Sequence, residues 1–72
     1  MQSEENIYLV SSLKKEISDL QSRIIQRKKH IERLSGGEKS SVTLFLIVKS
    51  QEKISQYEKE INEKRRRILS LE

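Results

Sequence analysis

The sequence predicts an all-α protein in which two amphipathic helices fold back on each other as an antiparallel coiled-coil hairpin. Apolar residues recur at alternating spacings of three and four in each half of the chain. The pair Gly36-Gly37 separates the two halves. The 72 residues include no proline, and 36% are charged, a composition typical of long helices. We expect one domain over residues 1–72, with a helix over 4–34, a turn over 35–39 and a helix over 40–71.

Each half of the chain carries a heptad seam, in which positions a and d face the partner helix. Arg27 is the charged residue of the first seam, whereas Ser50 and Lys64 make the second seam more polar. The remaining seam residues are Val10, Leu13, Ile17, Leu20, Ile24, Ile31 and Leu34 in the first half, and Ile47, Ile54, Tyr57, Ile61, Ile68 and Leu71 in the second.

The two heptad frames do not join into one continuous helix. The first frame, carried beyond Leu34, misses the second by two residues. Each glycine inside a helix costs about 1 kcal/mol, whereas glycine just after a helix end suits the left-handed cap conformation. We therefore expect a turn, with Ser40 or Ser41 capping the second helix. Antiparallel pairing of a with d then places residues whose numbers sum to 74 opposite each other, for example Leu20 and Ile54.

Residues 42–48 carry more apolar side chains than a single hairpin covers. The segment reads V-T-L-F-L-I-V, so a helix presents apolar groups around most of its circumference. Its β-branched residues also suit a strand, but the chain offers no partner strand and we favour a helix. A smaller group of apolar residues, 7–10, lies at the other end of the rod. Two hairpins stacked antiparallel would pack this group against segment 42–48 and form a four-helix bundle. The predicted interface residues are Ile7, Leu9, Val42, Leu44, Phe45, Leu46 and Val48.

Size and composition favour self-association and exclude several other classes of protein. A chain this short builds a small core that supplies little stability. The sequence has no cysteine and one histidine, so neither disulfides nor a structural zinc site supplements that core. We expect no catalytic residues, no metal site and no cofactor, and so no enzyme. No apolar run approaches the roughly 20 residues that span a bilayer, so we expect a soluble protein and, by default, a cytoplasmic one.

Two short strings resemble motifs of known families. The string L-S-G-G-E-K-S at residues 34–40 resembles the signature motif of ABC-type ATPases, which contacts the γ-phosphate of ATP. The phosphate-loop motif that such an ATPase requires is missing, so a glycine turn explains these residues. Ser50-Gln51-Glu52 resembles part of the S-Q-E-L-D stretch of small helical-hairpin phosphatases. Ile54 occupies the position of that family's essential aspartate, so the resemblance does not imply catalysis. It leaves one alternative function, that of a small regulator that docks on a signalling protein.

Two basic clusters and a net charge of +4 support a different alternative, a small helical dimer that binds nucleic acid. No aromatic residue is interleaved with the cations for base stacking, and the hairpin separates the clusters along the rod. We therefore favour a protein-interaction module, with a second copy of the chain as the first expected partner and helices of a larger protein as the other. The clusters comprise Arg27, Lys28, Lys29 and Arg33, and Lys64, Arg65, Arg66 and Arg67.

A charged residue within the seam should restrict the oligomeric state. We predict that Arg27→Leu raises the melting temperature, because an apolar side chain replaces a polar one in the seam, but broadens the set of oligomers. The stem of Arg27 should pack while its guanidinium reaches water. Thermal melting followed by circular dichroism and light scattering on a sizing column test both effects. Higher stability with one unchanged oligomer would contradict the role in specificity.

Overall fold

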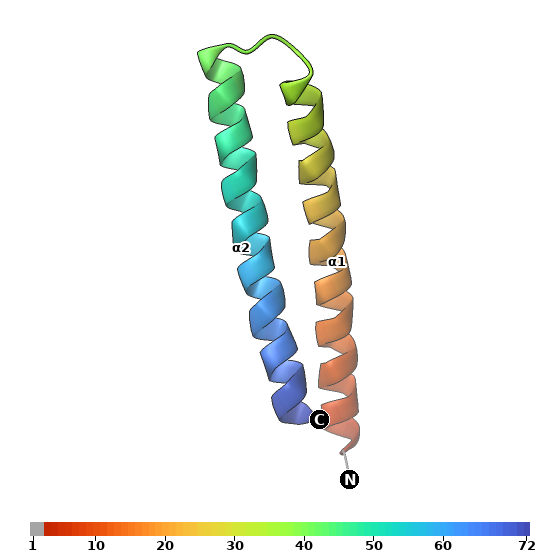
Figure 1. Ribbon diagram of the computed structural model, residues 1–72. Coiled ribbons are helices and arrows are strands. Elements are labelled where there is room, and N and C mark those ends of the chain that lie inside the picture. The colour runs from red at the N-terminus through yellow and green to blue at the C-terminus, as the bar shows by residue number, and fades with distance from the viewer. Residues whose placement is uncertain (1–2) are drawn as a thin grey trace.

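The fold is an antiparallel hairpin of two long helices, as predicted. The computed structural model describes residues 3–72, so the first two residues of the predicted domain lie outside the described part. Helix α1 spans Glu4–Ser35 and helix α2 spans Ser41–Leu71, and the two lie side by side with both chain ends at the same end of the rod (Figure 1). The Cα positions extend over 56 × 14 × 11 Å. Residues 42–48 are helical, so the helix was the right choice over a strand.

Helix α1 begins with a side-chain cap. The Ser3 hydroxyl accepts a hydrogen bond from the Asn6 amide at 3.2 Å, which satisfies one of the free amides of the first turn. Glu4 and Glu5 place negative charge at the positive end of the helix dipole. At the other end, the Gly36 amide donates to the Glu32 carbonyl at 3.1 Å.

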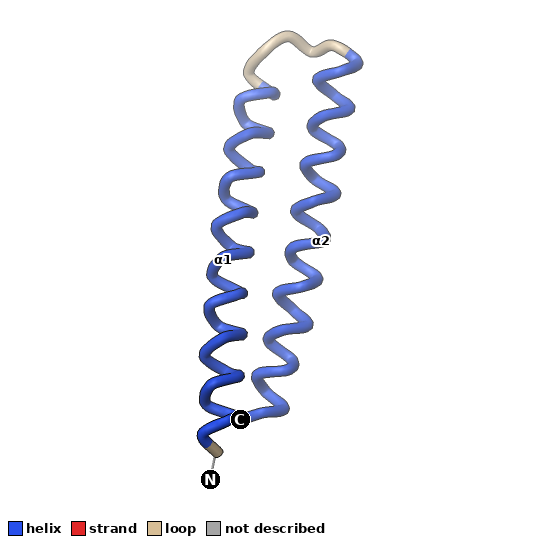
Figure 2. Tube along the Cα trace, turned by 180° about the vertical axis from the view of Figure 1, so that it is seen from behind, coloured by secondary structure: helices blue, strands red, loops and turns tan. Residues whose placement is uncertain are grey.

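The glycines end α1 in a different conformation from the predicted one. Gly36 has φ −83° and ψ −8°, which is right-handed, and no glycine of residues 3–72 has a positive φ. The left-handed cap expected from the sequence is therefore wrong. The chain instead leaves the last turn of α1 through an open loop, drawn in tan in Figure 2. Glycine's poor helix propensity is the property that matters at this position.

Ser40, and not Ser41, caps α2. Ser40 is extended, with φ −91° and ψ 166°, and its hydroxyl accepts a hydrogen bond from the Thr43 amide at 3.1 Å. The hydroxyls of Ser40 and Thr43 are also hydrogen bonded, at 3.0 Å. Ser41 is the first residue of the helix and is exposed. Only a residue with extended backbone just before the helix can aim its oxygen at the free amides, which decides between the two serines.

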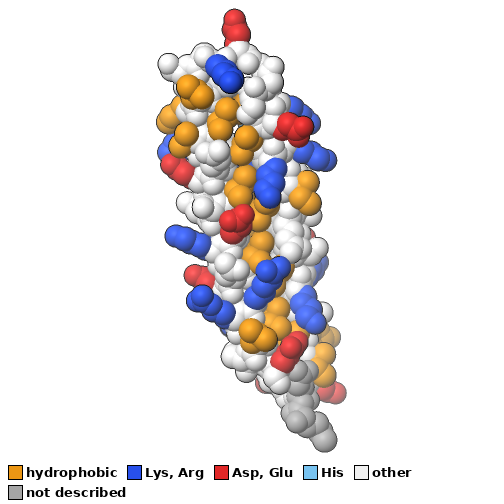
Figure 3. Space-filling model, in the orientation of Figure 1, with side chains coloured by type: hydrophobic (Ala, Val, Ile, Leu, Met, Phe, Trp, Pro, Cys, Tyr) orange, Lys and Arg blue, Asp and Glu red, His pale blue; other side chains and the backbone are white. Residues whose placement is uncertain are grey.

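The core is the predicted heptad seam. Every a and d position from residue 10 to residue 34 and from residue 43 to residue 71 is buried or half-buried. Figure 3 shows the seam as an orange stripe between the helices. The buried apolar residues are Val10, Leu13, Ile17, Leu20, Ile24, Ile61 and Ile68, with Ile54, Tyr57 and Leu71 packed against them.

Packing is tighter in the half of the rod that holds the chain ends than in the half that holds the loop. Arg27, Ile31 and Leu34 of α1 are only half-buried, as are Thr43 and Ile47 of α2. The helices also diverge toward the loop in Figures 1 and 2. Seam residues near the loop therefore contribute less burial than those near the ends.

The two helices are paired in a different register along the rod from the predicted one, in which residue numbers summed to 74. Under that register Asn6 would lie opposite residue 68 and Glu16 opposite residue 58. Instead the Asn6 amide group donates to the Leu71 carbonyl at 3.4 Å, and Glu16 Oε2 lies 3.2 Å from Lys64 Nζ. Both partners lie further toward the C-terminus of α2 than predicted. A heptad pattern repeats every seven residues, so sliding one helix by a heptad again matches apolar positions, and the sequence pattern cannot choose between such registers.

The cap on α2 generates a prediction with a matched control. Ser40→Ala removes the acceptor of the Thr43 amide and should lower the free energy of unfolding by about 0.5–2 kcal/mol. Ser41→Ala, one residue later, removes the same hydroxyl from a helical position where alanine is favoured and should be neutral or stabilising. Urea unfolding followed by circular dichroism compares the two variants. Equal destabilisation by both would show that Ser40 is not the cap.

Candidate functional site

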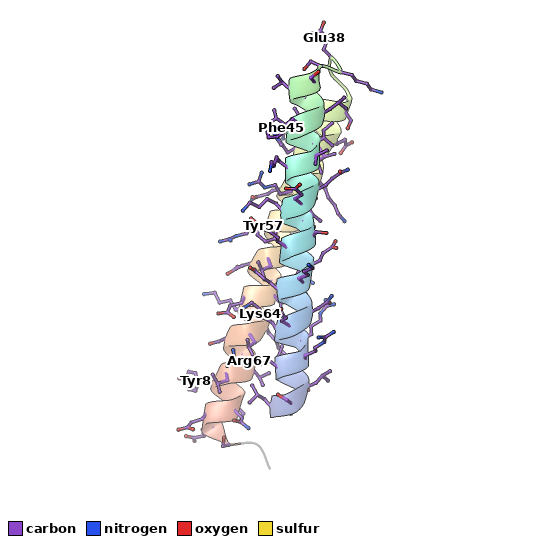
Figure 4. All side chains as sticks on the ribbon, turned by 90° about the vertical axis from the view of Figure 1, so that its left-hand side faces the viewer. Tyr8, Glu38, Phe45, Tyr57, Lys64 and Arg67 are labelled. Carbon is purple, nitrogen blue, oxygen red and sulfur yellow. The ribbon has the colours of Figure 1, made fainter. Side chains whose placement is uncertain are left out.

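The predicted interface residues are all exposed in the single chain. Phe45 is 58% exposed and Val42 68%, whereas the seam residues beside them are half-buried. Figure 4 places Phe45 near the loop end of α2 and Tyr8 near the opposite end of the rod. The full set is Ile7, Leu9, Val42, Leu44, Phe45, Leu46 and Val48, each at least 41% exposed.

These residues do not form one continuous patch. The e positions of both helices flank the seam on one side, where Lys14 Nζ lies 4.0 Å from the Glu72 carboxylate. Ile7 and Leu44 are e positions and lie on this side. Leu9 and Leu46 occupy g positions and so lie on the opposite side of the rod. The segment 42–48 therefore exposes apolar side chains in several directions, which no single flat partner covers.

The side with the e positions carries two further aliphatic residues that the sequence analysis missed. Ile25 is 54% exposed and Leu69 is 73% exposed, and both are b positions, adjacent to e around the helix. Comparing the outward heptad positions, rather than reading contiguous apolar runs, would have found them. We call this side the aliphatic face, defined by Ile7, Ile25, Leu44, Val48 and Leu69. Figure 3 views the face directly, with orange side chains outside the central stripe near both ends of the rod.

Phe45 lies on the outer side of α2, at an f position. Lys49 Nζ lies 5.5 Å from the centre of its ring, and the same ammonium lies 3.5 Å from a carboxylate oxygen of Glu52. An exposed cation–π contact contributes about 0.5–1 kcal/mol, less than the burial of a phenyl ring. The contact covers part of the ring without removing it from solvent.

The basic clusters stay apart, as the hairpin predicts. Arg27 is in the loop half of the rod, whereas Lys64 is in the half with the chain ends. Both are half-buried seam residues, and Lys64 is paired with Glu16. Their stems therefore belong to the helix interface. The cluster residues left exposed are Lys28, Lys29, Arg33, Arg65, Arg66 and Arg67.

The described residues show no cluster of metal ligands, and Ser50 is buried. Among residues 3–72, no three His, Cys, Asp or Glu side chains are grouped so that they could hold a metal ion. Ser50, which carries the resemblance to the phosphatases, is 3% exposed within the seam and is not accessible to a substrate. Neither helix of this part of the chain is apolar enough over a sufficient length to cross a membrane.

Comparison of the chain with protein-family models, curated proteins and solved structures finds no match. The exposed surfaces of the hairpin are therefore the basis for proposing its function.

Proposed function

We propose that this chain is a non-catalytic interaction module that binds helices of a partner through apolar residues left exposed by its own seam. The observation that carries the proposal is the segment 42–48, in which Val42, Leu44, Phe45, Leu46 and Val48 are between 41% and 68% exposed. Five exposed apolar side chains within seven residues are a local concentration of apolar surface, and such concentrations mark protein–protein contacts. The proposal places the protein in the cytoplasm.

The energetics of the isolated hairpin support a partner. Seven apolar residues are buried, and no large side chain of the described residues is less than 2% exposed. Such a core supplies little net stability to a chain of 72 residues. Burying an exposed Leu or Phe contributes about 1.5–3 kcal/mol per side chain. A partner that covers a few of these residues therefore stabilises the fold as well as the complex.

The mechanism is helix-on-helix packing. A second copy of the chain, or a pair of helices in a larger protein, would complete a four-helix bundle around the hairpin. The interface would draw on the exposed apolar residues of segment 42–48, Phe45 included. No group of the chain changes its chemistry on binding, so the module acts by holding its partner in place.

Binding to nucleic acid is the second candidate, and the six exposed cationic residues of the basic clusters favour it. The dependence of binding affinity on salt concentration distinguishes the two functions. A complex with nucleic acid weakens steeply as salt increases, because each phosphate contact releases a counterion. Apolar helix packing is far less sensitive to salt. Titration of a labelled duplex and a labelled single strand at about 50 mM and 200 mM salt distinguishes them, and binding that is lost at the higher salt would favour nucleic acid.

The proposed interface predicts a strong effect of Phe45→Glu. The substitution removes the burial of the ring and places a carboxylate where the partner would exclude water, so association should weaken by at least about 1.5–3 kcal/mol. The a and d positions of the intrachain seam are untouched. Sedimentation equilibrium over a range of concentrations measures the change.

Ser22→Glu is the matched control. Ser22 is also an exposed f position, on α1, so the substitution adds the same charge without removing apolar surface. It should assemble as the parent does. If Phe45→Glu also assembles as the parent, with unchanged helicity, then the segment 42–48 is not the interface.

A further inference from the structure

We propose that the partner is a second copy of this chain, held antiparallel on the side of the rod opposite the aliphatic face. The loop half of each copy then covers the chain-end half of the other. The assignment rests on the proposed interaction function and adds the partner, the side and the orientation. Three features of this side support it: its charges separate by sign along the rod, the hollows between the helices separate in the same way, and both ends carry exposed apolar residues.

The side opposite the aliphatic face, which we call the charged face, comprises the c and g positions of both helices. In the loop half of the rod, residues 20–59, its four charged residues are all basic. In the chain-end half, residues 3–19 and 60–72, five are acidic and one is basic, a net charge of −4. All ten are exposed. They are Arg23, Arg33, Lys49 and Lys53 in the loop half, and Glu5, Glu16, Asp19, Glu60, Glu63 and Arg67 in the chain-end half.

The sign of the charge changes at the same height on both helices. Glu16 Oε2 of α1 lies 3.2 Å from Lys64 Nζ of α2, so residue 20 of α1 is level with residue 60 of α2. On α1 the sign changes between Asp19 and Arg23, and on α2 it changes just before Glu60. The charged face is therefore divided across its width into a basic half and an acidic half. The b and e positions of the aliphatic face carry charges of both signs in each half and show no such division.

Two hollows along the charged face show the same separation in space. The hollow nearer the chain ends contains three carboxylates and two cations, and the hollow nearer the loop contains three cations and one carboxylate. Among residues 3–72, Asp19 and Glu60 of the first hollow and Arg27 and Lys53 of the second form no ion pair. These groups can therefore pair with charges of another molecule. The first hollow is lined by Glu16, Asp19, Leu20, Arg23, Glu60 and Lys64, and the second by Arg27, Lys49, Glu52, Lys53 and Gln56.

At the loop end, the basic half of the charged face continues into the apolar segment 42–48. Val42 and Leu46 occupy c and g positions of this face, and Phe45 lies beside them at an f position. All three are exposed, and Lys49 Nζ lies 5.5 Å from the centre of the Phe45 ring. Apolar side chains and a cation therefore lie next to each other at this end.

At the opposite end, the acidic half of the charged face offers a complementary surface. Tyr8 and Leu9 are exposed, and they line a hollow together with Glu4 and Glu5. Apolar side chains therefore lie next to carboxylates at this end. The two ends match in chemistry, since both are apolar and their neighbouring charges are of opposite sign.

Antiparallel packing of two copies brings unlike charges together and covers both apolar ends. The basic half of each charged face lies against the acidic half of the other, and the loop end of each rod lies against the chain-end end of the other. A parallel copy would instead set like charges against each other. Complementary potentials of this kind favour one orientation over another. Apolar burial at the two ends supplies affinity, because exposed ion pairs alone contribute little.

The experiment reverses charge in the basic half of the full chain. A variant with both Arg23→Glu and Lys53→Glu should form dimers on the order of ten-fold more weakly, because each copy exchanges two attractive contacts for repulsive ones. Sedimentation equilibrium at about 50 mM salt, where exposed charges are weakly screened, measures the dissociation constant. The matched control carries Lys28→Glu and Lys29→Glu, which change the net charge equally in the same half of the rod but at e and f positions. It should associate as the parent does.

A second variant, with Asp19→Lys and Glu60→Lys, reverses charge in the acidic half. Alone it should also associate weakly, but an equal mixture of the two reversed variants should associate as tightly as the parent, because the reversed charges then meet each other. A mixture that stays dissociated would overturn the proposal. Circular dichroism checks that each variant is helical, and if the second variant loses helix, the comparison of the first with its control still decides.

The outcome for the proposed function is separate. If Phe45→Glu abolishes self-association, yet the first reversed variant and its control associate equally, then the module function stands and the charged face is wrong. Stronger association of the first reversed variant would place loop half against loop half and overturn the antiparallel orientation. A chain that stays monomeric at every concentration overturns the second copy as the partner, and a larger helical protein is then the remaining occupant. A duplex that binds with steep salt dependence to a monomeric chain overturns both.

Discussion

The rest of the structure depends on the burial of one heptad seam between α1 and α2. Neither helix packs against any other element of the described chain, so the helices owe their tertiary stabilisation to this contact. Apolar burial along the seam fixes which side of each helix faces inward, and through that it fixes which residues face outward on every other side. The ion pair Lys14–Glu72 joins two exposed groups, and the pair Glu16–Lys64 joins an exposed carboxylate to a half-buried lysine; both remain in contact with solvent and contribute little by comparison.

The seam is buried unequally along its length. Near the chain ends it is filled by Val10, Leu13, Ile61 and Ile68, which are all buried. Near the loop, Ile31 and Ile47 are half-buried. The segment 42–48 lies beside this looser part, where the hairpin offers least cover and apolar side chains are most numerous. The loop half of the rod therefore combines the least buried part of the seam with many exposed apolar side chains.

Charge has a different role from apolar burial in this molecule. Arg27 and Lys64 interrupt the seam, where an apolar residue would stabilise more, and such residues in coiled coils restrict the register and the oligomeric state. Helix α1 is also asymmetric in charge, with a net charge of −2 in residues 4–19 and +4 in residues 20–35.

The sequence by itself determined the two helices, the position of the turn and the membership of the seam. Local propensity and heptad spacing act within a few residues, so a glycine pair and residues such as Leu13 or Ile61 reveal their roles without the partner helix. Only the tertiary structure decided the register, the choice of Ser40 as the cap and the right-handed conformation of Gly36. It also showed that Ile25 and Leu69 share a side with Leu44. A seven-residue repeat matches itself after every shift of seven, so relative position along the rod is fixed by the loop geometry and by contacts between the helices, which a pattern read along one chain does not contain.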